Sequence, residues 1–212
     1  MRVLFVHGWG NSTEIWDAVV ENLQTDVEYV LADFGFFGMK KMPDPGYYDI
    51  VVGHSLGVLW LLSQNKITWE KLISICGFSK YSTGGSFPEG VPNRVIERMI
   101  RKLPFSSEGV LRTFHELCDP EKQVPFDLSS CPNQEQLMWG LQFLCDEDAR
   151  LHYDPLNTFI LADKGDQVVS QAMTTSLFGF ENVTWLEGKG HLVPLTAPAA
   201  CNALIERAIT SL

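Results

Sequence analysis

The sequence lacks the features that mark membrane-spanning and secreted proteins. No apolar run approaches the roughly 20 residues that a transmembrane helix requires. The apolar start of the chain stops at His7 and Gly8, whereas a secretory signal needs a longer apolar stretch and a small-residue cleavage site. We therefore expect a cytoplasmic protein with no membrane span.

Cysteine and positive charge are also scarce. The five cysteines (Cys76, Cys118, Cys131, Cys145 and Cys201) are widely spaced and form no Cys-x-x-Cys pair, which favours reduced thiols over a disulfide framework or a zinc site. The formal net charge of -10 argues against nucleic acid as a partner, because no overall positive field would attract phosphates. A local basic patch remains compatible with this charge.

The length of 212 residues, with 45% hydrophobic and 20% charged residues, fits one globular domain with a single core. Six short apolar runs predict strands buried on both faces, as in a parallel sheet flanked by helices. They are Arg2–Val6, Val27–Asp33, Asp49–Gly53, Leu72–Cys76, Thr158–Ala162 and Val183–Leu186. Asn11 and Glu14 resemble a capping box that begins the first helix, and a Pro/Gly-rich loop is expected from about Met39 to Tyr47.

The region from about Phe78 to Asp154 breaks this alternation of strands and helices. It contains several helical patterns, which are interrupted by six prolines. An insertion between two strands of a parallel sheet would lie over a site at the strand ends. We therefore expect a core formed by residues 1–77 and 155–212 and a helical lid formed by residues 78–154.

A candidate nucleophile lies between the third strand and the helix that follows it. Gly53-His54-Ser55-Leu56-Gly57 is a Gly-x-Ser-x-Gly sequence in the strand–turn–helix context of a nucleophile elbow. Ser55 would stand at the head of a helix, where backbone amides favour a developing negative charge. Its hydroxyl needs a base to take its proton.

His191 is the predicted base, because it directly follows the last strand in a glycine-containing loop. Its rivals are the four other histidines: His7, His54, His115 and His152. An acid must then hold the histidine tautomer, and the loop after the fifth strand offers Asp163 and Asp166. We favour Asp166, since a turn after Gly165 could aim its carboxylate at the histidine. The resulting order of Ser, Asp and His is that of the α/β-hydrolase fold.

The oxyanion of an acyl-transfer intermediate needs backbone N–H donors. One is expected from Leu56, the residue after the nucleophile. The other is expected from the loop after the first strand, most simply from Trp9. This chemistry needs no metal and no organic cofactor.

Taken together, these motifs resemble the α/β-hydrolase family. More narrowly, His7-Gly8-Trp9-Gly10-Asn11 followed by Ile15-Trp16, and Gly-His-x-x-Pro at Gly190–Pro194, resemble the pimeloyl-ACP methyl ester carboxylesterases of biotin synthesis. Those enzymes release methanol from a pimeloyl chain on acyl carrier protein. The Phe114-x-x-Leu117 segment is similar to a substrate-contacting lid segment of that family, which implies a substrate-binding role for Phe114. The resemblance implies a minimal sheet of six parallel strands, because the family's first two strands have no counterpart here.

Between Pro92 and Pro104 the sequence predicts a short amphipathic helix. Val95, Ile96, Met99, Ile100 and Leu103 fall on one face at about 100° per residue. Arg94, Arg98, Arg101 and Lys102 fall on the other, with Glu97 as the single acid among them. This basic face could dock the acidic acyl carrier protein, or it could be an ordinary solvated helix face.

Three functional hypotheses follow from the sequence. The first is a serine carboxylesterase acting on carrier-bound methyl pimelate. The second is a hydrolase of the same mechanism acting on another small ester, lipid or thioester. The third is a non-catalytic hydrolase fold that serves as a binding module.

Overall fold

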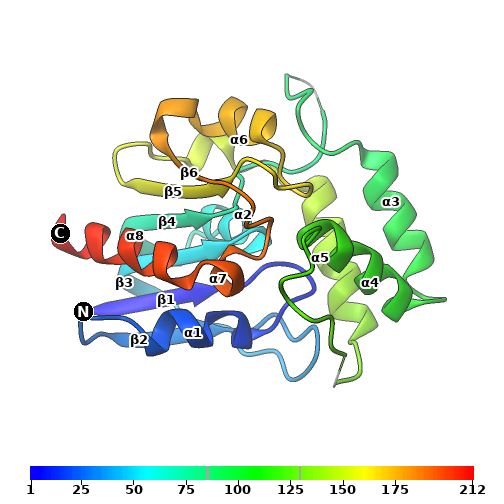
Figure 1. Ribbon diagram of the computed structural model, residues 1–212, viewed down its shortest axis with the longest axis horizontal. Coiled ribbons are helices and arrows are strands. Elements are labelled where there is room, and N and C mark those ends of the chain that lie inside the picture. Colours follow the sequence, from blue (N-terminus) through cyan, green and yellow to red (C-terminus); the bar gives the residue numbers. More distant parts are fainter. Residues whose placement is uncertain (85, 129) are drawn as a thin grey trace.

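The computed structural model of the protein describes residues 1–84, 86–128 and 130–212. Its centre is a sheet of six strands in the order β2-β1-β3-β4-β5-β6, and every neighbouring pair is parallel. The expectation of six parallel strands is thereby confirmed. Figure 1 shows the strand arrows pointing away from the two chain termini and toward a separate group of helices, α3, α4 and α5.

The strands lie where the apolar runs predicted them, with differences at their ends. Their bounds are β1 Arg2–Val6, β2 Glu28–Ala32, β3 Gly46–His54, β4 Ile67–Ile75, β5 Thr158–Asp163 and β6 Val183–Leu186. β3 and β4 begin earlier than expected, so Gly46 and Tyr47 belong to a strand and not to the preceding loop. The first residues of β4 alternate between buried and exposed positions, which a search for continuous apolar runs does not detect.

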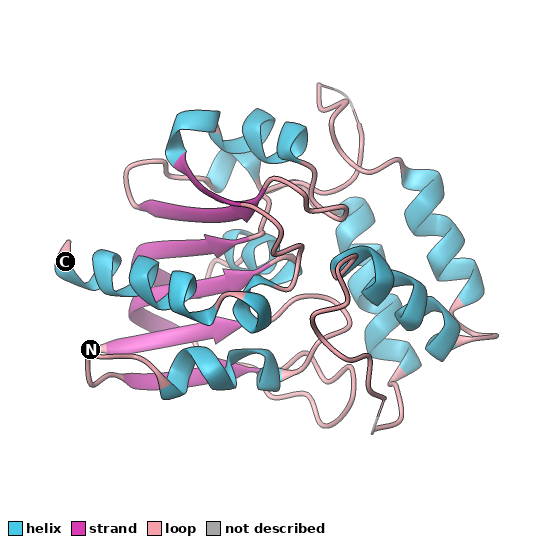
Figure 2. Ribbon diagram, in the orientation of Figure 1, coloured by secondary structure: helices cyan, strands magenta, loops and turns pink. Residues whose placement is uncertain are grey.

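The helices of the core cover both faces of the sheet (Figure 2). Helices α1 (Asp17–Glu21), α7 (Val193–Thr196) and α8 (Pro198–Thr210) pack on one another, and α8 also packs on β4 and β5. Helix α2 (Leu56–Leu62) packs on β1, β3 and β4, and α6 (Gln171–Phe178) packs on β5. Short 3-10 turns cover Thr13–Trp16, Arg150–His152 and Phe180–Asn182.

The chain builds the sheet outward in opposite directions from the neighbouring strands β1 and β3. The connection through α1 leads from β1 outward to β2, whereas the connection through α2 leads from β3 the other way to β4. Right-handed crossovers then place α1 and α2 on opposite faces of the sheet. The loops that leave the carboxyl ends of β1 and β3 therefore diverge to opposite faces. Open α/β sheets bind ligands in the crevice between such loops.

The first helical segment begins one residue later than the sequence suggested. Ser12, and not Asn11, is the N-cap, and its hydroxyl accepts a hydrogen bond from the Glu14 amide at 3.4 Å. Asn11 instead donates from its side chain to the Trp9 carbonyl at 3.2 Å. The capping box on Asn11 was therefore wrong, because its amide side chain is used within the loop after β1.

Three helices between β4 and β5 lie beside the carboxyl ends of the strands (Figures 1 and 2). They are α3 (Asn93–Lys102), α4 (Ser107–Cys118) and α5 (Gln134–Asp146). Backbone groups tie them to the core, since Asn133 donates to the Phe36 carbonyl at 2.7 Å and Ala149 to the Ser79 carbonyl at 2.8 Å. In α3 the four basic side chains are exposed as expected, but Val95 is 43% exposed and so does not join the buried face.

Within the described residues, no helix is long and apolar enough to cross a membrane. The longest helices have 13 residues, well short of the roughly 20 that a bilayer demands.

The packing of α2 against β1 depends on Gly57. A Cβ at this position would lie 2.3 Å from the Val6 carbonyl oxygen and 2.9 Å from that of His7. We expect Gly57→Ala to lower the free energy of unfolding by about 1–3 kcal/mol, the range typical of overpacking, as measured by urea denaturation. Gly38→Ala is the control, since a Cβ there meets no atom within 4 Å; equal stability of the two variants would contradict this account.

Candidate active site

Ser55 lies in a sharp turn between β3 and α2. Its backbone has φ 54° and ψ -120°, a strained conformation for a residue with a side chain. The turn is held by the Ser55 amide, which donates to the Ile75 carbonyl at 3.1 Å, and by the Val58 amide, which donates to the Ser55 carbonyl at 3.0 Å. This geometry raises the hydroxyl of Ser55 above the carboxyl end of the sheet, as a nucleophile elbow requires.

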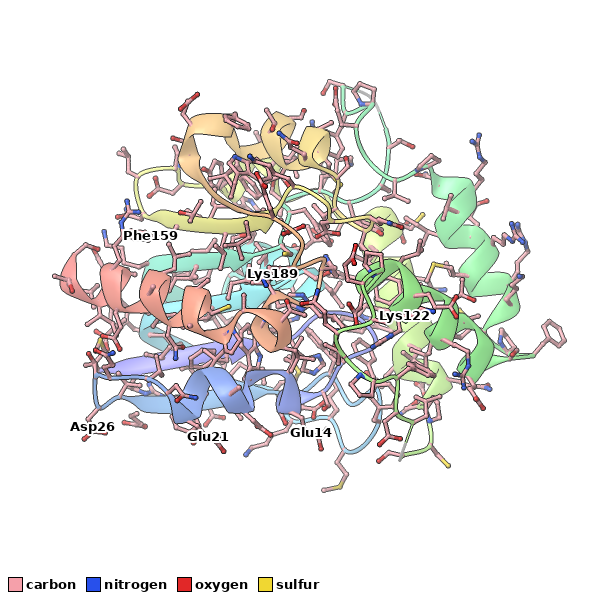
Figure 3. The ribbon with its side chains drawn as sticks, in the orientation of Figure 1. Glu14, Glu21, Asp26, Lys122, Phe159 and Lys189 are labelled. Atoms are coloured by element: carbon pink, nitrogen blue, oxygen red, sulfur yellow. The ribbon has the colours of Figure 1, made fainter. Side chains whose placement is uncertain are left out.

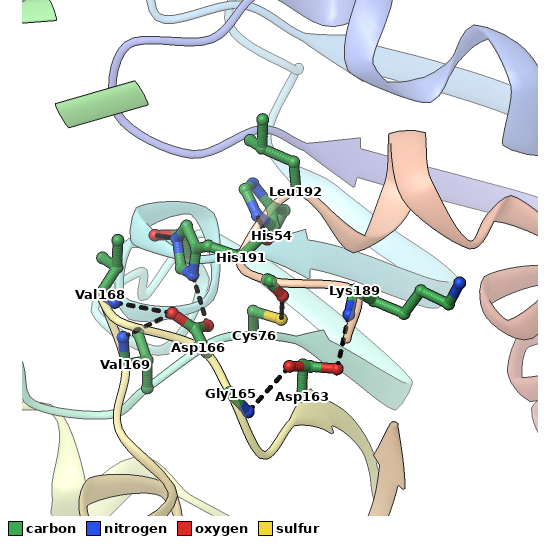
Figure 4. A network of polar contacts seen from close by, with 12 residues as sticks. His54, Cys76, Asp163, Gly165, Asp166, Val168, Val169, Lys189, His191 and Leu192 are labelled. Atoms are coloured by element: carbon green, nitrogen blue, oxygen red, sulfur yellow. Dashed lines mark hydrogen bonds and ion pairs between the residues drawn. The ribbon is translucent and has the colours of Figure 1, made fainter. Parts of the chain in front are cut away.

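His191 reaches this hydroxyl from the loop after β6. Its Nε2 lies 2.9 Å from Ser55 Oγ, and its Nδ1 lies 2.7 Å from Asp166 Oδ2. The contact with Asp166 is visible in Figure 4. All three residues are buried, so their hydrogen bonds act in a medium of low dielectric constant. In this arrangement Nδ1 donates to the carboxylate and Nε2 is free to accept the serine proton.

The structure distinguishes clearly between the two candidate acids. Asp166 uses Oδ2 for His191, while its Oδ1 accepts the amides of Val168 and Val169 at 2.7 and 2.9 Å (Figure 4). Asp163 instead accepts the amides of Gly165 at 2.8 Å and Lys189 at 2.9 Å. Asp163 thus links the loops after β5 and β6, and only Asp166 contacts the histidine.

The remaining histidines have other partners. His7 accepts the Phe34 amide at Nε2 and lies 2.9 Å from the Gly8 carbonyl through Nδ1. His152 bonds to the Leu62 carbonyl at 2.8 Å, and His115 packs on Phe126. His54 is buried beside His191, with Nε2 bonded to the carbonyl oxygen of His191 at 2.9 Å. Sequence reasoning treated His54 only as a rival base.

One expected oxyanion donor follows Ser55 directly in the chain, and the other lies in the loop after β1. Leu56 is the first residue of α2, and Trp9 lies in the loop after β1, the strand that α2 packs on. In the described part of the chain, neither backbone amide donates a hydrogen bond to a turn, loop or cap. The indole of Trp9 donates to the Leu137 carbonyl of α5 at 2.9 Å, which fixes the loop against the helices beside the strand ends.

A cleft of about 430 Å³ is lined by Gly10 and Leu192, the chain neighbours of Trp9 and His191, but by none of the triad residues. Phe114 of α4 lines it, with its ring 4.9 Å from that of Trp9 and 6.5 Å from that of His191, measured between centroids. Leu117, the other residue of the resembling segment, is 43% exposed and is not among the residues that line the cleft. The charged residues of the lining are Glu14, Asp33 and Asp127, and neither Lys nor Arg contributes among the described residues. Figure 3 shows Glu14 at the end of the first helical segment nearer to α4, with Glu21 farther along it and Asp26 in the loop beyond.

One group of side chains in the described residues has ligand atoms close enough to hold a metal ion. The atoms of Cys76, Asp166 and His191 lie within 4.8 Å of one another. Two of them are already joined by the bond between Nδ1 and the carboxylate. Burial raises the pKa of the Cys76 thiol well above its usual value, whereas a metal ligand must be a thiolate. The arrangement is therefore accounted for by hydrogen bonding, and we assign no metal to it.

Comparisons with known proteins agree with this geometry. No family model matches the chain. It is 24% identical over 164 residues to the pimeloyl-[acyl-carrier protein] methyl ester esterase of Legionella pneumophila (strain Lens), covering 71% of this chain and 68% of that protein. An α/β-hydrolase fold protein from Burkholderia ambifaria superposes with a TM-score of 0.68 at 15% identity, covering 96% of this chain and 89% of that one. The chain has the α/β-hydrolase fold.

Within the α/β-hydrolase fold, the structural neighbours include proteins named for an ester-cleaving activity. The esterase from Exiguobacterium antarcticum superposes with a TM-score of 0.77 at 19% identity, covering 99% of this chain and 92% of that one. At this identity the likeness establishes the fold, and the reaction must be argued from the site.

The contrast between the two acids can be tested by labelling Ser55 with a fluorophosphonate. Asp166→Asn should slow labelling by about 10³–10⁴-fold, because an amide facing Nδ1 holds the wrong tautomer of the histidine. Asp163→Asn should slow it by less than about 10-fold, since that carboxylate contacts only backbone amides. Equal losses in the two variants would contradict the assignment of Asp166.

Proposed function

We propose that this protein is a serine carboxylesterase whose substrate is the methyl ester of pimeloyl-acyl carrier protein, and that it acts in the cytoplasm as a step of biotin precursor synthesis. The observation that carries the esterase proposal is the chain of hydrogen bonds from Ser55 through His191 to Asp166, at 2.9 and 2.7 Å. The substrate rests on the likeness to the Legionella esterases. Five free cysteines are compatible with a reducing compartment.

In the proposed mechanism, His191 takes the proton of Ser55 as the hydroxyl attacks the ester carbonyl. The amides of Leu56 and Trp9 hold the oxyanion of the tetrahedral intermediate. The intermediate collapses to an acyl-enzyme as His191 gives the proton to the methoxy oxygen, which leaves as methanol. His191 then deprotonates a water molecule, which attacks the acyl-enzyme, and passes the proton to Ser55 Oγ as the carboxylic acid leaves.

The cleft supports an acyl chain as the bound group. Much of its lining is apolar, including Leu111, Phe114, Val124, Phe126, Leu192 and Leu195. Burial acts to raise the pKa of Asp33, but the hydrogen bond from the Gly35 amide and the neighbouring His7 outweigh it and lower the pKa, which keeps one lining carboxylate ionised. Negative charge in a partly apolar cleft favours an uncharged ester over the carboxylate that hydrolysis produces. The product is thus repelled once it forms.

Helix α3 supplies the proposed docking surface for the carrier protein. Arg94, Arg98 and Arg101 are exposed, and Arg101 has only a long contact of 3.8 Å with Glu97. The chain as a whole carries a net charge of -10, so this face would attract an acidic partner only at short range. Such complementarity acts mainly on the association rate and on partner choice.

A second candidate is the same mechanism on a different small ester. The structural likeness to the E. antarcticum esterase favours it. The non-catalytic binding module is disfavoured, because such a module has no need for a strained serine within hydrogen-bond distance of a buried histidine.

The proposal is tested by comparing the wild type with Ser55→Ala on methyl pimeloyl-carrier protein and on a short chromogenic ester. We expect the wild type to hydrolyse the carrier-bound ester and the variant to lose at least about 10³-fold in rate, because the nucleophile is gone. Release of methanol is the readout for the first substrate. Turnover of the short ester alone would leave an esterase and rule out the carrier-bound substrate.

Charge reversal tests the docking surface. Replacing Arg94, Arg98 and Arg101 with Glu should lower kcat/KM for the carrier-bound ester by about 10-fold or more, with the short ester unaffected. The same number of reversals at the exposed Lys41, Lys66 and Lys164 controls for net charge. If both triple variants lost activity equally, or if the α3 variant lost activity on the short ester too, docking at α3 would be wrong.

A further inference from the structure

His54 occupies the variable position of the elbow, yet it is among the most tightly enclosed side chains of the site. It is fully buried. Its ring centroid lies 5.0 Å from that of His191 and 6.5 Å from that of Trp16. On a third side, a Cβ added to Gly8 would approach Nδ1 of His54 to 2.8 Å. These contacts leave the ring no freedom to take another orientation.

The ring makes one hydrogen bond, to the backbone of His191. A carbonyl oxygen can only accept, so Nε2 of His54 carries the proton and donates it across 2.9 Å. Burial, and secondly the nearby His191, lower the pKa of His54 well below its usual value. The ring therefore stays neutral with this tautomer, and in the described part of the chain its Nδ1 has no hydrogen-bond partner.

This bond completes a set of four that hold His191. The His191 amide donates to the Cys118 carbonyl at 2.8 Å, and its carbonyl accepts from His54. Its two ring nitrogens face Asp166 and Ser55. In Figure 4, His54 lies next to His191 while Asp166 approaches the ring of His191 from another direction. The peptide groups on both sides of His191 are thus fixed, and with them the position of its Cα atom.

We infer that His54 is a positioning residue, which holds the peptide of His191 so that its imidazole is aimed at Ser55 Oγ. It contacts neither of the reacting atoms and acts through His191. The inference rests on the proposed serine esterase chemistry, but not on the identity of the ester. Small misplacements of a catalytic group can cost about 10²-fold in rate.

Three substitutions separate the effect of the hydrogen bond on catalysis from the effect of the volume of the ring. His54→Gln retains an N–H donor at about the reach of Nε2, His54→Asn has a donor that is too short, and His54→Leu has none. We expect His54→Leu and His54→Asn to lower kcat for a chromogenic ester by about 10²-fold with KM within about twofold. We expect His54→Gln to recover most of the loss. Fluorophosphonate labelling of Ser55 should follow the same order.

His152→Leu is the matched control, because His152 also bonds to a backbone carbonyl, that of Leu62, outside the site. Its kcat should equal that of the wild type. The inference is overturned if His54→Gln is as slow as His54→Asn, or if neither differs from the wild type. If His54→Leu does not fold, the Gln and Asn pair still decides. A wild type that is labelled at Ser55 but cleaves no ester would count against the proposed function alone, since the labelling rates still test His54.

Discussion

The hydrogen bond between Ser55 Oγ and His191 Nε2 joins residues that are 136 positions apart in the chain, and the other parts of the site are arranged around it. It forms because parallel strands end at one edge of the sheet, where the loops after β3, β5 and β6 meet. The close packing of α2 on β1, which Gly57 permits, sets the position of the serine. The loop that carries His191 must then match it to within about 0.5 Å, which explains why that residue is held at four points.

The sequence predicted those parts of the molecule that are determined by residues close together in the chain. The glycines around Ser55 mark a turn that tolerates few other residues, and six apolar runs mark a buried sheet. Local patterns were less informative at the strand ends, where the start of β4 alternates between buried and exposed residues. They also misplaced the first N-cap, because Asn11 and Ser12 have equal propensity and only the fold decides between them. The contact of His54 with His191 spans 137 residues, and no local pattern records it.

The cleft and α3 carry charges of opposite sign, and this difference affects how a carrier-bound ester would bind. The cleft residues Glu14, Asp33 and Asp127 are acidic, while α3 exposes arginines. If α3 docks an acidic carrier as proposed, the carrier would be attracted to the helix and repelled by the cleft, and its uncharged acyl chain would be favoured to enter. The same field would act on the proposed product, because hydrolysis converts a neutral ester into an anion. Charge would then distinguish the substrate from both the carrier and the product.

The helices beside the strand ends are bonded to the same loops that build the site. The Cys118 carbonyl of α4 accepts the amide of His191, and the Leu137 carbonyl of α5 accepts the indole N–H of Trp9. Ser55 is only 4% exposed in this arrangement. A displacement of α4 would remove the bond between the Cys118 carbonyl and the His191 amide, and a displacement of α5 would remove the bond to the Trp9 indole. The bonds of His191 to His54, Asp166 and Ser55 come from outside these helices and would remain. Covering of the site and alignment of His191 thus share one hydrogen bond, while the other three, including that from His54, belong to the core.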